Sequence, residues 1–146
     1  MPGDSEQLRV EVYDTTLRDG TQGQDVHLTA DDKVAIAKRL DAFGIDFIEG
    51  GWPGSNPKDA RFFEQMKGVR LEHAKLTAFG STRHRDTPPE EDANLCALLE
   101  AGTEVVAIFG KSWTFHVEHA LGATLEQNLE MIRSSVAYLR SRGRRV

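Results

Sequence analysis

The loop after the first predicted strand reads Asp14-Thr15-Thr16-Leu17-Arg18-Asp19-Gly20-Thr21-Gln22. It sets the guanidinium of Arg18 directly beside the carboxylate of Asp19, at the carboxyl end of a strand expected over residues 8–13. A carboxylate is a preferred ligand of a hard cation, and a guanidinium matches another carboxylate or an enolate. An isolated Arg-Asp-Gly sequence is more often a salt-bridged turn, so the meaning of this loop depends on the fold around it.

Short β-rich runs alternate with helical segments along the whole chain. The first strand carries Val10 and Val12 on one face, and further strands are expected over residues 46–50, 75–79 and 104–109. A helix is expected after each strand, so the strands must run parallel. Four such units predict an α/β fold, either a small doubly wound sheet or the first half of a (β/α)₈ (TIM) barrel, which typically needs about 250 residues. The periodicity alone leaves both open.

Capping residues and apolar spacing place the helices. Gly44 and Gly143 are expected to end the first and last helices with a positive φ. Caps are expected at three helix starts, at Thr29 with Asp32, at Asn56 before Pro57, and at Thr124 with Gln127. The expected core residues, in helix order, are Ile36, Ala37, Leu40, Phe43, Phe62, Phe63, Met66, Leu95, Leu98, Leu99, Leu129, Ile132, Val136 and Leu139.

Composition narrows the function classes. The chain has 146 residues and a formal net charge of −5, which argues against binding to nucleic acid or to an anionic membrane surface. Cys96 is the single cysteine, so no disulfide forms within the chain. No apolar run approaches the roughly 20 residues that span a bilayer. We expect a cytoplasmic protein with a short tail over residues 1–8 and one domain over residues 9–146.

The complete loop over residues 14–22 is far more specific than its Arg-Asp-Gly core. It closely resembles the signature of the acyl-CoA-dependent TIM-barrel metalloenzymes that include the isopropylmalate, citramalate and homocitrate synthases and hydroxymethylglutaryl-CoA lyase. The second predicted strand, which contains Glu49, is also similar to that family. The resemblance extends from about Val10 to Val146 and implies the first four βα units of a TIM barrel.

This resemblance implies roles for particular residues. Arg18 would be the catalytic arginine that stabilises the charge of an enolate. Asp19 would be a ligand of a divalent metal ion, either Mg, Mn or Zn. Contacts to the substrate are expected from Arg18, Gln22, Glu49, Ser112 and His116.

Two further stretches narrow the resemblance to a subgroup. Residues 51–59 and 108–113 resemble the longer class of citramalate synthases, whereas isopropylmalate synthases typically have a different loop after the second strand. The implied reaction is an acyl transfer in which acetyl-CoA condenses with the 2-oxo acid pyruvate, giving citramalate and CoA for isoleucine biosynthesis. Two alternatives stay open: a 2-isopropylmalate synthase-type condensation with 2-oxoisovalerate, and a non-catalytic βα module that binds a small anion or a partner subunit.

The family's remaining metal ligands form a His-x-His pair. None of the five histidines belongs to such a pair: His27, His73, His84, His116 and His119. The fifth strand and the acid/base group that follows it are expected beyond Val146. We therefore expect these 146 residues alone to be catalytically inert, and the open edges of the first and fourth strands to promote self-association. The full-length enzyme is expected to be a homo-oligomer.

Overall fold

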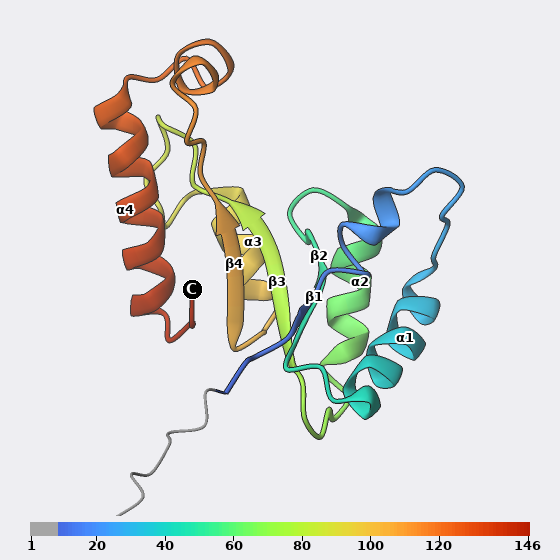
Figure 1. The fold of residues 1–146 in the computed structure, drawn as a ribbon. Helices are drawn as coiled ribbons and strands as arrows, with labels where there is room; N and C mark the ends of the chain where they lie inside the picture. Colours follow the sequence, from blue (N-terminus) through green and yellow to red (C-terminus); the bar gives the residue numbers. More distant parts are fainter. Residues whose placement is uncertain (1–8) are drawn as a thin grey trace, which may run out of the picture.

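The computed structural model describes residues 9–146, so the expected tail lies outside the described residues. Strands and helices alternate along this part of the chain (Figure 1). The strands are β1 (Tyr13–Asp14), β2 (Phe47–Gly51), β3 (Lys75–Ser81) and β4 (Val105–Phe109). The helices are α1 (Ala30–Phe43), α2 (Pro57–Met66), α3 (Ala93–Glu100) and α4 (Leu125–Ser141). Two short turns, the 3₁₀ turn η1 (Gly20–Gln22) and the π turn η2 (His116–Ala120), lie in the loops after β1 and β4.

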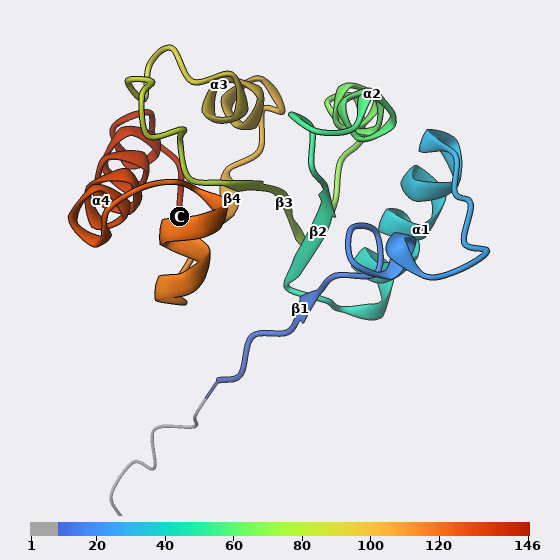
Figure 2. The same ribbon diagram turned by 90° about the horizontal axis from the view of Figure 1, so that it is seen from above.

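The strand order decides between the two architectures. The strands form one sheet in the order β1-β2-β3-β4, and every neighbouring pair is parallel. A doubly wound sheet reverses its strand order at a switch point, whereas a barrel adds each new strand beside the preceding one. Figure 2 shows the four helices arranged around one side of this sheet. The chain therefore folds as an open, partial TIM barrel.

The predicted helix starts are confirmed. Thr29 accepts from the backbone N–H of Asp32, and the side chain of Asp32 accepts in return from Thr29, which completes a capping box. Thr124 and Gln127 form the same arrangement at α4. Gly44 ends α1 at a φ of 93°, a left-handed conformation that costs glycine little. These local signals fix where each helix begins relative to the strand before it.

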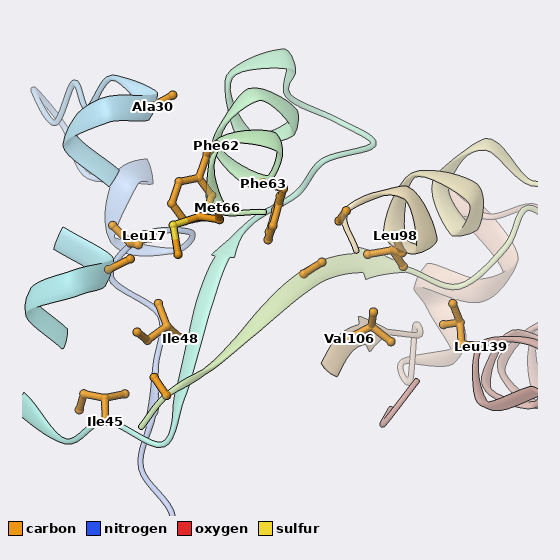
Figure 3. Packing of buried hydrophobic residues seen from close by; sticks show 14 of the residues in the cluster. Leu17, Ala30, Ile45, Ile48, Phe62, Phe63, Met66, Leu98, Val106 and Leu139 are labelled. Carbon is orange, nitrogen blue, oxygen red and sulfur yellow. The ribbon is translucent and has the colours of Figure 1, made fainter. Parts of the chain in front are cut away.

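The core lies between the sheet and its helices (Figure 3). Phe62 and Phe63 of α2 pack against Gly50 of β2 so closely that any side chain at Gly50 would overlap their rings. Leu95 and Leu98 of α3 are fully buried, as predicted. Burial of side chains of this size contributes about 1.5–3 kcal/mol each, which holds the helices against the strands.

The first strand is shorter than the sequence predicts. β1 begins at Tyr13, and the prediction of a strand over residues 9–12 is wrong; Leu8 lies outside the described residues. Val10 and Val12 are exposed. β2 begins only at Phe47, whose register partner is Tyr13. The carbonyl of Val12 still accepts from the backbone N–H groups of Asp46 and Phe47, but no residue before Tyr13 pairs as a strand.

Two expected core residues point to solvent. Phe43, in the last turn of α1, is 83% exposed. Leu129 of α4 is 66% exposed. The buried stripe of α4 is offset by one residue from the expected stripe at most positions and consists of Asn128, Met131, Ser135 and Leu139. Leu139 is common to both stripes.

A buried ion pair links α1 and α2 to the end of β2. Lys33 is 0% exposed, and its Nζ lies 2.5 Å from Oδ1 of Asp59. The other oxygen of Asp59 accepts from the backbone N–H of Trp52 at 2.9 Å. Burial lowers the pKa of Lys33, and the hydrogen bond from Lys33 to Asp59 opposes this shift. The pair therefore fixes the backbone that leaves β2 at the mouth of the partial barrel.

The far edge of β4 is engaged by the last residues of the chain. Arg145 donates its N–H to the carbonyl of Glu104 at 3.0 Å and accepts from Val106 at 2.9 Å, which forms a parallel bridge. The expectation of an unpaired edge at β4 is therefore wrong at this point, since Arg145 continues the sheet there. Across residues 9–146, no helix has the length and apolar character needed to cross a membrane.

Candidate active site

The loop after β1 is held in one conformation by its own backbone. The N–H groups of Arg18, Asp19 and Gly20 all point to the carbonyl oxygen of Thr15, at 2.9–3.1 Å. Leu17, within this turn, is fully buried in the core. Burying Leu17 while turning the next residues back over the sheet places the Arg18 side chain at the carboxyl end of the strands, where parallel barrels bind their ligands.

Arg18 is positioned by contacts from three elements. Its Nε donates to Oε1 of Glu49 on β2 at 2.5 Å, and its Nη1 lies 3.2 Å from Oδ1 of Asp19. Its guanidinium carbon lies 4.0 Å from the centre of the Phe79 ring on β3, a cation–π geometry. The predicted grouping of Arg18, Asp19 and Glu49 at one strand end is what the structure contains.

Glu49 is the buried member of this group. It is 3% exposed, and its two carboxylate oxygens accept from different residues, Oε1 from Arg18 and Oε2 from the hydroxyl of Tyr13. A buried carboxylate is tolerated when it is paired and hydrogen-bonded. Burial raises the pKa of Tyr13 above its ordinary value, and the hydrogen bond to Glu49 adds to that rise. The phenol of Tyr13 therefore remains protonated and remains a donor at neutral pH.

An aromatic layer lies beside Arg18. Phe79 stacks on Phe109 of β4 with ring centres 5.7 Å apart, and Trp52 meets both rings edge-on at 5.4 and 5.8 Å. The indole N–H of Trp52 donates to Asn94 at 2.8 Å. Sequence reasoning missed Tyr13, Phe79 and Phe109 as parts of the site. The available signal was their position on expected strands, but assigning them to the inner face requires the register between strands.

A cavity of about 370 Å³ opens between the ends of β3 and β4. Two of its arginines are engaged by backbone carbonyls: Arg83 donates to Thr87 at 3.0 Å, and Arg85 donates to Gly122. Lys111 places its Nζ 5.2 Å from the Phe109 ring. The lining residues include Trp52, Ser81, Arg83, Arg85, Phe109 and Lys111. This cavity and the Arg18 group share the aromatic layer as a common wall.

Three predicted site residues do not join this group. Gln22 is exposed in η1, and Ser112 and His116 are exposed in the loop after β4. His116 contacts the ring of Trp113, with centres 4.5 Å apart, and within residues 9–146 it has no hydrogen bond to Arg18 or Glu49. Their substrate contacts stay predictions.

Asp19 suits the role of one metal ligand. Its side chain is 63% exposed, and the contact with Arg18 uses Oδ1 alone. Among residues 9–146, no three His, Cys, Asp or Glu side chains lie close enough together to hold a metal ion. Metal sites in proteins use several ligands, so the described residues supply one oxygen donor and not a complete site.

Comparisons with known proteins identify the relatives of this chain. The (R)-citramalate synthase of Geobacter sulfurreducens is 53% identical over 132 residues, covering 90% of this chain and 25% of that protein. The 2-isopropylmalate synthase of Halalkalibacterium halodurans is 34% identical over 140 residues, covering 94% of this chain and 26% of that protein. The chain thus spans about a quarter of the length of these curated relatives.

The structural comparison supports the fold. A solved hydroxymethylglutaryl-CoA lyase from Pseudomonas aeruginosa matches with a TM-score of 0.71 and 23% identity, over 94% of this chain and 44% of that one. The HMGL-like family model matches residues 9–146, which are all of the residues that the structure describes. The resemblance seen in residues 14–22 is confirmed, and the chain belongs to the HMGL-like family.

Proposed function

We propose that this chain is the Arg18-bearing part of a citramalate synthase-type enzyme, which condenses acetyl-CoA with pyruvate to give citramalate and CoA. One observation carries the proposal. Arg18 is fixed by Glu49 and Phe79 at the carboxyl end of the sheet, while Asp19 beside it keeps an exposed carboxylate oxygen. The higher identity to a citramalate synthase than to an isopropylmalate synthase supports pyruvate as the 2-oxo acid.

The condensation of acetyl-CoA with pyruvate is favoured by a fixed positive charge near the reacting carbonyl. The methyl carbon of acetyl-CoA, after losing a proton, attacks the keto carbon of pyruvate; a C–C bond forms and the C=O π electrons move to the oxygen. Hydrolysis of the thioester by water then releases CoA as the thiol. Nε of Arg18 donates to Glu49 and Nη1 lies 3.2 Å from Oδ1 of Asp19, so the guanidinium is held in place and its positive charge would offset the developing oxyanion.

Asp19 would hold a divalent metal ion as one of its ligands. When bound, such an ion polarises the keto oxygen as a Lewis acid. Its choice among Mg, Mn and Zn depends on the other ligands, and an exposed carboxylate suits each of them. The cytoplasmic location and the homo-oligomeric state of the full-length enzyme stay predictions.

A chimera tests the proposal. Residues 9–146 replace the matching segment of the Geobacter sulfurreducens enzyme, to which the chain is 53% identical. CoA release is then measured with pyruvate and, separately, with 2-oxoisovalerate. We expect pyruvate to give the higher kcat/KM. A preference for 2-oxoisovalerate would favour the isopropylmalate-type reaction, and a folded chimera that releases no CoA with either 2-oxo acid would refute the proposal.

A further inference from the structure

Tyr13 reaches the candidate site from the first strand. Its ring stacks on Phe47 of β2, with ring centres 6.1 Å apart and an interplanar angle of 28°. Its hydroxyl donates to Oε2 of Glu49, the oxygen that Arg18 does not use. The backbone pairs Tyr13 with Phe47 in the parallel register of β1 and β2, so the ring is fixed by the sheet as well as by the stack.

The hydrogen bonds of Glu49 determine what Tyr13 does. Among residues 9–146, Arg18 and Tyr13 are the two side chains that donate to this carboxylate. A carboxylate that is held at one oxygen still turns about its last side-chain bond, because that torsion has a broad energy profile. When both oxygens are held, the plane of the carboxylate is fixed. The position of Oε1, and with it the direction of its hydrogen bond with Nε of Arg18, is then fixed too.

We propose that Tyr13 is a positioning residue for Arg18 and acts through Glu49. This inference rests on the proposed function, in which the guanidinium of Arg18 offsets the charge of the developing oxyanion. The burial of Glu49 supports it, because water does not replace a lost donor easily at a site that is 3% exposed.

The second tyrosine of the chain provides a control for a substitution at Tyr13. The chain contains two tyrosines, Tyr13 and Tyr138. Tyr138 is part of α4, and its hydroxyl makes no hydrogen bond within residues 9–146. In the active chimera, Tyr13→Phe keeps the ring and removes only the hydroxyl. We expect kcat to fall about 10- to 100-fold, as it does when an outer hydrogen-bond partner of a site residue is lost, with the KM for acetyl-CoA within about twofold. Tyr138→Phe is the control and should change neither constant.

A double substitution separates positioning from a general structural role. In a Glu49→Gln background, Tyr13→Phe should cost less than about twofold in kcat, because Tyr13 then has no carboxylate to hold. An equal loss in both backgrounds would overturn the proposal. So would a Tyr13→Phe variant with unchanged kcat, or a Tyr138→Phe variant that loses as much activity.

A readout that needs no activity keeps this test distinct from the test of the proposed function. In protein labelled with ¹⁵N in arginine, the Nε hydrogen of Arg18 should exchange with solvent at least about tenfold faster after Tyr13→Phe, and at an unchanged rate after Tyr138→Phe. If the unmodified chimera is inactive, the proposed function fails while this measurement still decides whether Tyr13 positions Arg18. An unchanged exchange rate in the Tyr13→Phe protein would overturn the positioning role.

Discussion

The loops after β1 and β4 lie at the same end of the sheet, but they hold Arg18 and His116 in opposite ways. In the β1 loop, residues 15–29, Arg18 contacts a buried carboxylate at 2.5 Å and an aromatic ring at 4.0 Å. In the β4 loop, residues 110–124, Ser112 and His116 are exposed. The neighbours of His116 are other exposed rings of the same loop, Trp113 and Phe115.

This difference indicates that the β1 loop and the β4 loop have different roles. A group that stabilises developing charge is most effective when it is already oriented, because reorientation during the reaction costs free energy. The β1 loop meets that requirement without any ligand. Exposed side chains on a loop suit contacts that form only when a substrate arrives and the loop closes on it. We therefore expect substitutions on the β1 side to be costly in themselves, and substitutions in the β4 loop to matter only with substrate present.

The largest expected effect is on the free energy of unfolding, and it differs between two lysines. Lys33→Met leaves Asp59 buried without its partner, so we expect the free energy of unfolding to fall by about 3–5 kcal/mol. Lys111→Met, at the β4 loop, should change the free energy of unfolding by less than about 0.5 kcal/mol, because Lys111 forms no ion pair with any of residues 9–146. Urea unfolding of both variants measures this. Equal losses of stability in the two variants would show that Lys33 and Lys111 are held equally firmly.

The next effect concerns the reaction. In the chimera, Arg18→Ala should lower kcat/KM for pyruvate about 10²–10³-fold, the usual cost of losing a donor to an oxyanion. Arg142→Ala removes an arginine that lies over Tyr138 on α4, far along the chain from the site, and should leave kcat/KM unchanged. If both variants keep full activity, Arg18 has no catalytic role.

A smaller effect is expected in the β4 loop. His116→Ala should lower kcat/KM about tenfold, or about 1.4 kcal/mol, with no change in the unfolding midpoint, because its contact forms only with substrate. His119→Ala, in the same η2 turn, is the control and should be neutral. A loss as large as that of Arg18→Ala would contradict the division of roles between the two loops.

The smallest effect tests whether helix starts explain the difference between the loops. Thr29 caps α1 after the β1 loop, and Thr124 caps α4 after the β4 loop, each through a complete capping box. Thr29→Ala and Thr124→Ala should each lower the free energy of unfolding by about 1 kcal/mol. Thermal unfolding measures both. A much larger loss for Thr29→Ala would mean that the cap, and not Glu49, holds the β1 loop in place.

Local signals in the sequence predicted a good part of this molecule. The caps at Thr29 and Thr124 and the turn at Gly44 depend on hydrogen bonds and backbone angles within a few residues. The amino-acid types at those few positions are therefore enough to predict them. The position of Arg18 and Asp19 at a strand end followed from the parallel strands, whereas the place of Glu49 beside them came from the family resemblance of the second strand.

Other features depend on how elements meet across space. Tyr13 reaches Glu49 because the register pairs Tyr13 with Phe47, and no spacing along the chain encodes that register. The offset stripe of α4, which leaves Leu129 exposed, depends on how the helix packs against its neighbours, which include α3 and η2. Both are decided by packing between segments that are distant in sequence, which a pattern of apolar residues does not specify.

The most direct test of the central claim is a crystal structure of the chimera with pyruvate and a divalent metal ion bound. We predict an Nη atom of Arg18 within about 3 Å of a pyruvate oxygen, a typical hydrogen-bond distance, with its Nε still on Glu49. Asp19 should be a ligand of the metal, and the β4 loop should have moved toward the substrate. Pyruvate bound away from Arg18, with Glu49 and Arg18 separated, would contradict it.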